Sequence, residues 1–394
     1  MRVGYLTAEY AYGNRHRGGL GNYLRRLTLA LAERGHEPHV FYYIDEPSCI
    51  HIDHGIHIHF INSRRSKRIA KINSVTRNKL RQTLDGLERS CRFRRYLREA
   101  VLSYSLDILQ VPSANWPGLL VSNDIPMVTR SSGHQLLCDR FEGLSLTLDR
   151  RLYGHLELLQ YRRAAGIFAP SKLLAATLEK SEGVPEVAVI RTPFFIEVDE
   201  LDGTVYADSL QGEDYILFFG KLSPLKGPQV IADALPLVWK RYPDLVAVFV
   251  GEDRAFDNKT RMVEYIRKKC RGFEHKIRFF PLLPHDQLYA IVQNARLVVL
   301  PSLFDNSPNT MLEAMGFGKP VVGTYGSSMD EFIDDGISGF LVRRGDSQEL
   351  AEKICEAWNH PELESIGAAA KAVVLQYRPD NVIPQLLDFY ERYF

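Results

Sequence analysis

The sequence predicts an α/β protein made of two doubly wound, Rossmann-like parallel-sheet domains that face each other across a central cleft. Short apolar runs alternate with amphipathic stretches along the chain, which is the pattern of βαβ units. This rhythm restarts near residue 213, after an acidic and irregular segment at residues 192–215 that we interpret as a linker. A chain of 394 residues is long enough for two or three domains.

Twelve candidate strands carry the fold prediction, six in each half of the chain. In the first half they are residues 2–6, 39–43, 108–111, 127–129, 167–169 and 187–190. In the second half they are residues 215–219, 246–250, 277–280, 297–300, 320–322 and 340–342. Between the first two, Leu24, Leu27 and Leu31 share one face of a predicted helix at residues 22–34, and Gly35 ends it. We place the domains at 1–195 and 213–375.

Composition and charge exclude several classes of protein. Hydrophobic residues make up 45% and charged residues 25%, as in an ordinary globular chain rather than a disordered or disulfide-built one. The 49 basic and 48 acidic side chains leave no overall field that would attract nucleic acid. Five scattered cysteines without a C-x-x-C pair indicate reduced, mostly buried thiols, and no apolar run is long enough to span a membrane. We therefore expect a cytoplasmic protein.

Two lysines follow the first strand of the second half, in the stretch FFGKLSPLKGPQV. Parallel sheets bind ligands outside the carboxyl ends of their strands, so Lys221 and Lys226 are well placed for a diphosphate. Two solvated lysines on a polar loop are an equally good interpretation of the spacing alone.

The densest signal is the stretch LVVLPSLFDNSPNTMLEAMGFGKPVVGT, in which a buried strand enters a polar loop and then a helix near residues 309–316. The loop and helix start hold four good capping residues: Asn306, Ser307, Asn309 and Thr310. Backbone N–H groups gather at such a helix start, which favours an anion. The carboxylate of Glu313 suits a vicinal diol such as a ribose. Asp305 or Glu313 taken alone also fits a structural role.

These stretches resemble the retaining glycosyltransferases of family GT4, which have the two-domain GT-B fold. The matching pieces follow the family's order through most of the chain: GGLGNYLRRLTLALAERGHEPHVF, DILQVPS, IPMVT, FFGKLSPLKG, FVGED, DNSPNTMLEAMGFGKPVVGT and SSMDEFIDDGISGFLV. One piece would be weak evidence, whereas the ordered set makes a strong match.

The resemblance implies a role for each matching residue. Lys226 and Lys221 would bind the donor diphosphate, Glu313 the ribose hydroxyls and Asp305 the hydroxyls of the transferred sugar. The backbone from Asn306 through Ser307, Pro308 and Asn309 to Thr310 would hold sugar and phosphate, Gly19 would let its backbone approach the β-phosphate, and Leu283 would lie near the nucleobase. A C-terminal helix at about residues 376–394 would return to the N-terminal domain.

Three positions depart from the family's pattern. Lys221 stands where the family usually has Arg, which replaces a bidentate fork by a point charge. Asp305 replaces the first Glu of the E-x7-E region and is one methylene shorter. The family's N-domain histidine would fall near Ser131, whereas the nearest histidine is His134, which either points into the cleft or caps its own segment.

The implied activity is retaining transfer of a hexose from a nucleotide-diphosphate sugar to a hydroxyl of a glycan or lipid-linked acceptor, in polysaccharide or glycan biosynthesis. No metal and no cofactor would be required, and UDP is the expected base, with GDP and ADP open. A sugar-nucleotide epimerase of GT-B fold and a non-catalytic sugar-nucleotide-binding protein remain alternatives. An NAD-dependent oxidoreductase, with Gly18–Gly21 and Asp45 as its dinucleotide site, is a weaker alternative. The glycine order G-G-x-G in this chain departs from the dinucleotide-binding pattern G-x-G-x-x-G.

Four histidines, His51, His54, His57 and His59, are spaced as on a strand, so that all of them could share one face. A metal site would need a carboxylate beside them, and Asp53 falls on the other face. We therefore favour a solvated strand.

Residues 64–98 form a basic stretch, in which thirteen Lys and Arg residues face only Asp85 and Glu88, with apolar residues interleaved. Such a stretch could rest on anionic lipid headgroups at the inner face of a membrane or bind an acidic, lipid-diphosphate-linked acceptor. It could also be a solvated helical pair that packs its apolar residues inward. We slightly favour peripheral membrane contact and exclude nucleic acid as a partner.

Overall fold

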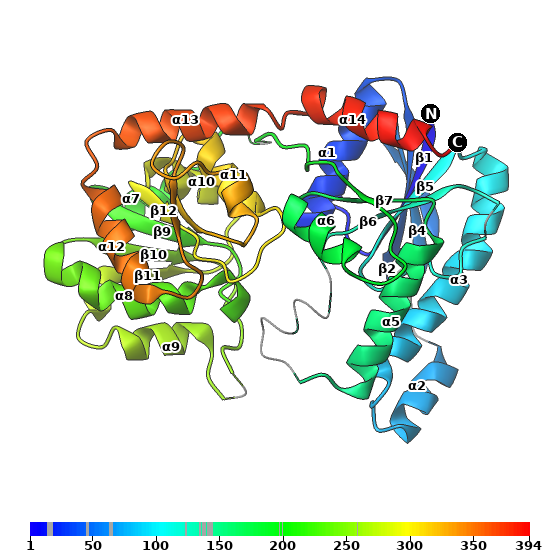
Figure 1. Ribbon diagram of the computed structural model, residues 1–394, viewed down its shortest axis with the longest axis horizontal. Coiled ribbons are helices and arrows are strands. Elements are labelled where there is room, and N and C mark those ends of the chain that lie inside the picture. The colour runs from blue at the N-terminus through cyan, green and yellow to red at the C-terminus, as the bar shows by residue number, and fades with distance from the viewer. Residues whose placement is uncertain are drawn as a thin grey trace. The chain divides into compact units, whose positions relative to one another are not determined.

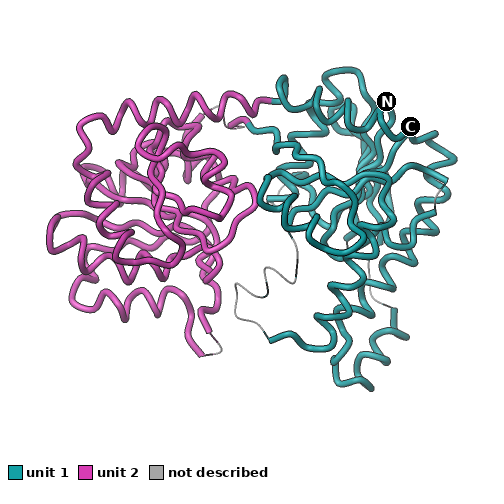
Figure 2. The backbone as a smooth tube through the Cα atoms, in the orientation of Figure 1, with its two compact units in different colours: residues 1–194, 379–394 teal, residues 195–378 magenta. Residues whose placement is uncertain are grey.

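The computed structural model describes the chain apart from residues 14–18, 45–46, 63–65, 123, 134, 136–138, 140–144, 197, 199 and 258. The chain forms two compact units, coloured separately in Figure 2. Unit 1 contains Met1–Phe194 and Pro379–Phe394, and unit 2 contains Phe195–Arg378. Each unit is built on its own sheet (Figure 1).

Unit 1 has an eight-stranded sheet in the order β3-β4-β2-β1-β5-β6-β7-β8. The strands are β1 (Arg2–Thr7), β2 (Glu37–Ile44), β3 (Cys49–Asp53), β4 (Ile56–Asn62), β5 (Ile108–Pro112), β6 (Met127–Arg130), β7 (Gly166–Ala169) and β8 (Val187–Val189). All neighbouring pairs are parallel except β3 with β4. Crossover connections therefore cover both faces of the sheet with helices, as in a doubly wound fold.

The helices of unit 1 are α1 (Gly19–Glu33), α2 (Lys67–Val75), α3 (Arg81–Tyr104), α5 (Leu148–Arg163), α6 (Lys172–Glu179) and α14 (Pro379–Glu391). Helices α1 and α3 lie on opposite sides of the sheet (Figure 1). Phe93 and Leu97 of α3 are buried against Leu6 and Phe41 of the central strands. Burial of such apolar surface holds α3 on the sheet, although many of its remaining side chains are basic.

The C-terminal helix α14 packs within unit 1, beside α1 (Figure 1). The hydroxyl of Tyr390 donates a hydrogen bond of 2.6 Å to Oε1 of Gln110 on β5. Arg34, just after α1, forms an ion pair with Asp380. These contacts attach the last residues of the chain to its first half.

Unit 2 has a six-stranded sheet in the order β11-β10-β9-β12-β13-β14, and all its neighbouring pairs are parallel. The strands are β9 (Tyr215–Phe219), β10 (Val246–Val250), β11 (Ile277–Phe280), β12 (Leu297–Val299), β13 (Val321–Thr324) and β14 (Phe340–Val342). The helices are α7 (Thr204–Ser209), α8 (Pro228–Arg241), α9 (Met262–Lys269), α10 (His285–Asn294), α11 (Asn309–Gly316), α12 (Ser347–Trp358) and α13 (Leu363–Leu375). The predicted pair of doubly wound α/β domains is thus confirmed.

Two local predictions are wrong. The stretch predicted as an irregular linker contains helix α7, and Gln287 Nε2 at the start of α10 donates to Asp202 just before it, at 2.8 Å. The four histidines do not share a face, because a turn at His54 and Gly55 folds their segment into the antiparallel hairpin β3–β4. In this register His51 pairs with Ile58, so it lies on the opposite face from His57 and His59.

Two further features concern the cysteines and the membrane. Among the described cysteines, Cys270 and Cys355 are buried but Cys49 and Cys91 are exposed, so the expectation of mostly buried thiols holds for only half of them. Within the described ranges, no helix combines the length and the apolar character that crossing a membrane requires.

Candidate functional site

Two loops of unit 2 meet at the carboxyl ends of β9 and β12, which are neighbours in the sheet. The loop after β9 forms a short 3-10 turn at Pro224–Lys226, and the backbone N–H of Leu303 in the other loop donates to the carbonyl of Leu225 at 2.9 Å. Gly227 ends the turn with φ +77°, and a Cβ atom there would lie 2.0 Å from the carbonyl oxygen of Pro301. Only glycine allows this approach, which brings the two predicted ligand loops together.

Lys226 and Asp305 form an ion pair between these loops, from Nζ to Oδ2. The Lys226 side chain is 33% exposed and the Asp305 side chain 10%. The second oxygen of Asp305 accepts a hydrogen bond of 2.9 Å from the backbone N–H of Asn306. The positive charge predicted for a diphosphate therefore already has an anionic partner within the protein.

Lys221 lies two residues after the end of β9 and is exposed. Among the described residues its side chain has neither a hydrogen-bond nor an ion-pair partner. Its position depends on glycines: Gly220 has φ +127°, and a Cβ at Gly251, at the end of β10, would lie 1.8 Å from the carbonyl oxygen of Gly220. The ammonium group of Lys221 is thus available to an anion from solvent.

Helix α11 begins at Asn309. Its start lies beside the loop that holds Lys221, since Thr310 Cγ2 would be 3.4 Å from a Cβ atom added to Gly220. Pro308 occupies the N-cap position, and no side chain caps the helix. The N-cap position is thus occupied by proline, which supplies no side-chain acceptor, and not by one of the four predicted caps Asn306, Ser307, Asn309 and Thr310. Among the described residues, the N–H groups of Asn309 and Thr310 have no side-chain acceptor, while the Met311 N–H donates to the Pro308 carbonyl at 3.1 Å; free N–H groups of this kind bind phosphate at other helix termini.

Two polar side chains are buried beside this helix start. Ser307 Oγ is shielded from solvent and has no hydrogen-bond partner among the described residues. Glu313 lies on α11, one turn into the helix, and only 5% of it is exposed. A buried polar group is costly unless it is hydrogen-bonded, so the unpartnered Ser307 hydroxyl marks a place where a polar ligand atom would lower the free energy.

The remaining predicted residues are spread more widely. Leu283 is half-buried in the segment between β11 and α10, at the edge of the same sheet of unit 2. Gly19 is exposed and is the first residue of α1 in unit 1. His134, and Gly18 and Asp45 of the dinucleotide alternative, lie outside the described residues. Ser131, at the slot expected for the family's histidine, is buried and its hydroxyl lies 2.7 Å from the Tyr161 hydroxyl.

A buried acidic residue in unit 1, Glu157 on α5, was missed by sequence reasoning. Burial raises the pKa of Glu157 to about 8; hydrogen bonds from the Gln135 backbone and Ser113 partly oppose this shift, and the charge of Asp139 adds to it. Asp139 is itself buried and lies 2.6 Å from Nη1 of Arg150. The available signal was the helical spacing of Glu157 between Tyr153 and Tyr161, which share its buried face.

The basic stretch of unit 1 forms α2 and α3. Helix α3 packs its apolar residues into the core, as the solvated-helix alternative requires, and Arg64 and Arg65 lie outside the described residues. Exposed basic residues remain on both helices and their connection: Lys67, Arg68, Lys71, Arg77, Lys79, Arg81, Arg94, Arg95 and Arg98.

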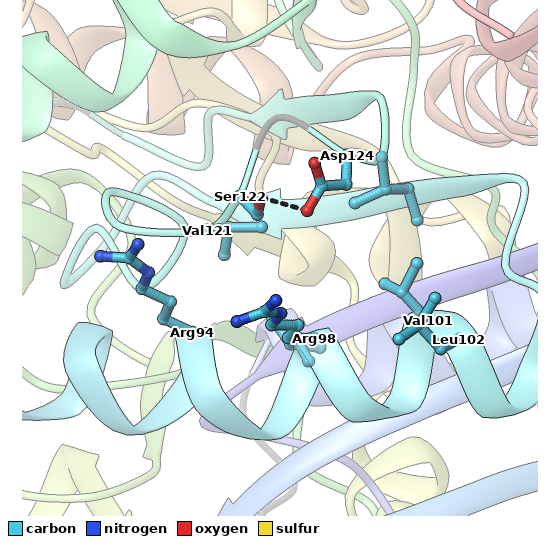
Figure 3. Close-up of a pocket in the computed structure, with 9 residues that line it drawn as sticks. Arg94, Arg98, Val101, Leu102, Val121, Ser122 and Asp124 are labelled. Atoms are coloured by element: carbon cyan, nitrogen blue, oxygen red, sulfur yellow. Dashed lines mark hydrogen bonds between the residues drawn. The ribbon is translucent and has the colours of Figure 1, made fainter.

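A pocket of about 190 Å³ lies between α3 and the segment that follows β5 (Figure 3). Arg94 and Arg98 line it from α3 together with the apolar residues Val101 and Leu102. On the opposite wall Ser122 Oγ donates to Asp124 at 2.5 Å. The pocket therefore combines two guanidinium groups and the carboxylate of Asp124 with apolar side chains.

Two family models match the sequence of this protein. The model described as "Glycosyltransferase Family 4" matches residues 17–197, and the model "Glycosyl transferases group 1" matches residues 213–360. Together the matches cover most of the chain and fall on the two sheets in turn. The chain belongs to glycosyltransferase family 4.

Curated relatives of this family-4 chain include D-inositol 3-phosphate glycosyltransferase of Corynebacterium urealyticum, 28% identical over 177 residues. That alignment covers 44% of this chain and 42% of the relative. The putative glycosyltransferase EpsD of Bacillus subtilis is 25% identical over 183 residues, 46% of either chain. The alignments thus span less than half the length of these relatives.

Solved structures confirm the GT-B fold of this family-4 chain. Sucrose-phosphate synthase from Thermosynechococcus elongatus has a TM-score of 0.75 at 15% identity, with 99% of this chain and 98% of the other covered. Anabaena HepE, solved with UDP and glucose, has a TM-score of 0.74 at 18% identity, with both chains fully covered at 100%.

Proposed function

We propose that this protein is a retaining glycosyltransferase that transfers a hexose from a nucleotide-diphosphate sugar, UDP-hexose first, to a hydroxyl of a glycan or lipid-linked acceptor in polysaccharide or glycan biosynthesis. The observation that carries the proposal is the uncapped start of α11 beside Lys221 and Lys226. Membership of family 4 and the UDP and glucose in the HepE structure support the donor class. Unit 2 would bind the nucleotide sugar and unit 1 the acceptor.

The diphosphate would lie over the loop after β9. Lys221 would contribute an unpaired ammonium group, and the first N–H groups of α11 would donate to the phosphate oxygens. Lys226 would be shared between the diphosphate and Asp305. Negative charge grows on the leaving diphosphate during glycosyl transfer, so these fixed positive groups would stabilise the transition state without a metal or cofactor.

The sugar and the nucleoside would be held by groups around α11. Asp305, fixed by the Asn306 N–H, would accept from hydroxyls of the transferred hexose, and the Ser307 hydroxyl would gain a partner there. Glu313 would accept from the two ribose hydroxyls, and Leu283 would contact the base. The backbone at Gly19 and the side chain of His134 remain our candidates in unit 1 for contact with the β-phosphate and the reacting sugar.

Retention would follow a front-face path. The bond from the anomeric carbon to the β-phosphate oxygen would break while the acceptor oxygen bonds to the same face of that carbon. The acceptor proton would pass to the departing phosphate. This route needs no protein nucleophile, so the residues of the site would act by binding and by charge.

Peripheral contact with the inner face of a membrane is proposed for the basic surface of α2 and α3. Ile72 and Val75 of α2 are 37% and 77% exposed among the basic residues, and Leu102 beside the Arg94–Arg98 pocket is 78% exposed. Exposed apolar side chains within a basic surface suit an anionic lipid or a lipid-linked acceptor.

Donor hydrolysis and nucleotide-dependent stabilisation test the proposal directly. We expect UDP, rather than GDP, ADP or NAD, to raise the melting temperature, and UDP-hexose to be cleaved slowly without acceptor. Lys226→Ala should weaken both effects, whereas Lys240→Ala, an exposed lysine at the end of α8, should keep them. Epimerised UDP-sugar as the product, binding without turnover, or a response to NAD alone would each refute transfer. The anomeric configuration of a transfer product, read by NMR, tests retention.

A further inference from the structure

Four ionisable side chains of unit 1 gather on one face of its sheet, at the amino ends of β2 and β4. Glu37 and His39 are alternate residues of β2, and His57 and His59 are alternate residues of β4. The two strands are parallel, and His39 is the register partner of His57. Side chains two residues apart point to the same side of a strand, so all four meet on one surface. The carboxylate that Asp53 could not provide thus comes from the neighbouring strand.

Three of these side chains converge on a common point. Oε1 of Glu37 lies 3.2 Å from Nε2 of His39 and 3.8 Å from Nε2 of His57. One ligand atom from each residue lies within 4.8 Å of the others. A tetrahedral zinc ion with bonds of about 2.0–2.1 Å requires ligand atoms about 3.4 Å apart, so only small side-chain rotations would close the set around one ion.

The convergent atoms are also oriented by outer partners. Nδ1 of His39 lies 3.1 Å from Nε2 of His59, so His39 can donate from Nδ1 and keep the lone pair of Nε2 for the common point. The other carboxylate oxygen of Glu37, Oε2, accepts from Nε of Arg2 at 3.2 Å. Metal-binding histidines and carboxylates usually have such hydrogen-bonded outer partners, which fix the tautomer and the direction of the lone pair.

The point of convergence is open to solvent on one side. His39 and His59 are fully buried, whereas the side chains of Glu37 and His57 are 42% and 27% exposed. Glu37 also lines a surface hollow of about 220 Å³ together with Met1, Arg2, Gly35 and Asp107. An ion would therefore have a path from solvent and a water molecule for its fourth position.

We propose that Glu37, His39 and His57 bind one divalent transition-metal ion of the Zn²⁺ type. Two imidazole nitrogens and one carboxylate oxygen suit Zn²⁺ or Co²⁺ and do not suit Mg²⁺ or Ca²⁺, which take oxygen ligands. The site lies at the amino ends of the strands, whereas open parallel sheets bind substrates at their carboxyl ends. The ion therefore links β2 to β4 and stabilises unit 1. This proposal is independent of the proposed glycosyl transfer.

Titration of the untagged full chain with Co²⁺ tests the site, because cobalt bound by nitrogen ligands in a tetrahedral site has visible d–d absorption. We expect one equivalent to bind and Zn²⁺ to displace it. Glu37→Gln and His57→Ala should each weaken Co²⁺ binding by more than about tenfold, since loss of outer partners alone costs 10–100-fold. His51→Ala, on the opposite face of the hairpin, and His54→Ala, in its turn, should bind as the wild type.

Two outcomes would overturn the metal site. One is the absence of a d–d spectrum at stoichiometric Co²⁺. The other is equal Co²⁺ binding by wild type and His57→Ala. Equal binding would mean that Glu37, His39 and His57 only contact one another and that exposed histidines elsewhere bind the ion. Far-UV circular dichroism shows whether each variant folds. As a second measurement, Zn²⁺ should raise the melting temperature of the wild type and of His51→Ala but not of Glu37→Gln.

Discussion

The ammonium group of Lys226 lies against the carboxylate of Asp305, 79 residues further along the chain. Both residues were expected at the donor site, but with different partners: the diphosphate for the lysine and the sugar for the aspartate. Their pairing holds the lysine side chain at the carboxyl end of β9 before any donor arrives. The same pairing means that a diphosphate must compete with Asp305 for the charge of Lys226.

Replacement of either partner should therefore have opposite effects on nucleotide binding. Lys226→Ala should weaken UDP binding about tenfold. This is the lower end of the range for loss of a hydrogen bond to a charged group, because the Lys226 side chain is one-third exposed. Asp305→Asn removes the competing charge, so UDP should bind as tightly as in wild type or a few times more tightly, while hexose transfer falls by about tenfold or more. Calorimetry with UDP and a transfer assay measure the two effects. Weaker UDP binding in Asp305→Asn would contradict competition.

Glu313 should give the site its preference for a ribonucleotide. If its buried carboxylate accepts from the ribose hydroxyls, wild type should bind 2′-deoxy-UDP about tenfold more weakly than UDP. Glu313→Gln should bind both ligands weakly and lose that difference. Calorimetry with the two nucleotides measures it. An unchanged ratio in the variant would place the ribose elsewhere.

Gly227 should be needed for the stability of unit 2. A Cβ there would meet the Pro301 carbonyl at 2.0 Å, in addition to the cost of φ +77°. Gly272 is a matched control, because it has φ +89° and no atom within 4 Å of the added carbon. Gly272→Ala should lose only the conformational cost of about 1–2 kcal/mol, and Gly227→Ala about 1–3 kcal/mol more through overpacking. Urea unfolding measures both, and equal losses would contradict the close approach of the two loops.

Glu157 should make the stability of unit 1 depend on pH. Its pKa is raised from 4.5 to about 8 in the folded protein. A group whose pKa is higher in the folded than in the unfolded protein stabilises the folded state. This contribution is complete at pH values below the unfolded pKa and is lost as the pH rises through the folded pKa. The loss between pH 5 and pH 9 is on the order of 4 kcal/mol, at about 1.4 kcal/mol per pKa unit, because part of the titration falls outside this range.

Glu157→Gln keeps an oxygen acceptor for the Gln135 N–H and removes the titration. The variant should therefore gain stability relative to wild type as pH rises, with the difference appearing between pH 5 and pH 9. Denaturant unfolding at several pH values measures this difference. A constant difference across the range would mean that Glu157 does not titrate there.

The pocket that Arg94 and Arg98 of α3 line should contribute to binding of anionic vesicles. Reversing the charges of Arg94 and Arg98 should weaken binding to phosphatidylglycerol vesicles about 30-fold or more, at about 1 kcal/mol per basic residue. The matched control is Lys240→Glu with Arg271→Glu, two exposed residues of unit 2 that carry the same change in net charge. Vesicle sedimentation at low and high salt compares the two. Equal losses in both double variants would indicate an effect of net charge alone.

The sequence was informative where local pattern decides the structure. Strands such as β9 and β10 are short runs of Val, Leu and Phe with turn residues after them, and burial on both faces demands that composition. The hairpin β3–β4 was predicted only as a single solvated strand through His51–His59, because the alternating histidines gave no sign of the turn between the two strands or of the burial of His59. Helix α7 was missed because six residues between acidic segments carry no clear helical period.

The sequence by itself determined the two sheets, the family and the loops that hold Lys221, Lys226 and the start of α11, because these depend on local periodicity and on motifs contiguous in the chain. Only the tertiary structure decided which side chains meet. The Lys226–Asp305 pair, the burial of Glu157 and the convergence of Glu37 with His57 arise from strand register and helix packing between distant segments. Those contacts are set by the burial of the whole core, which no local pattern encodes.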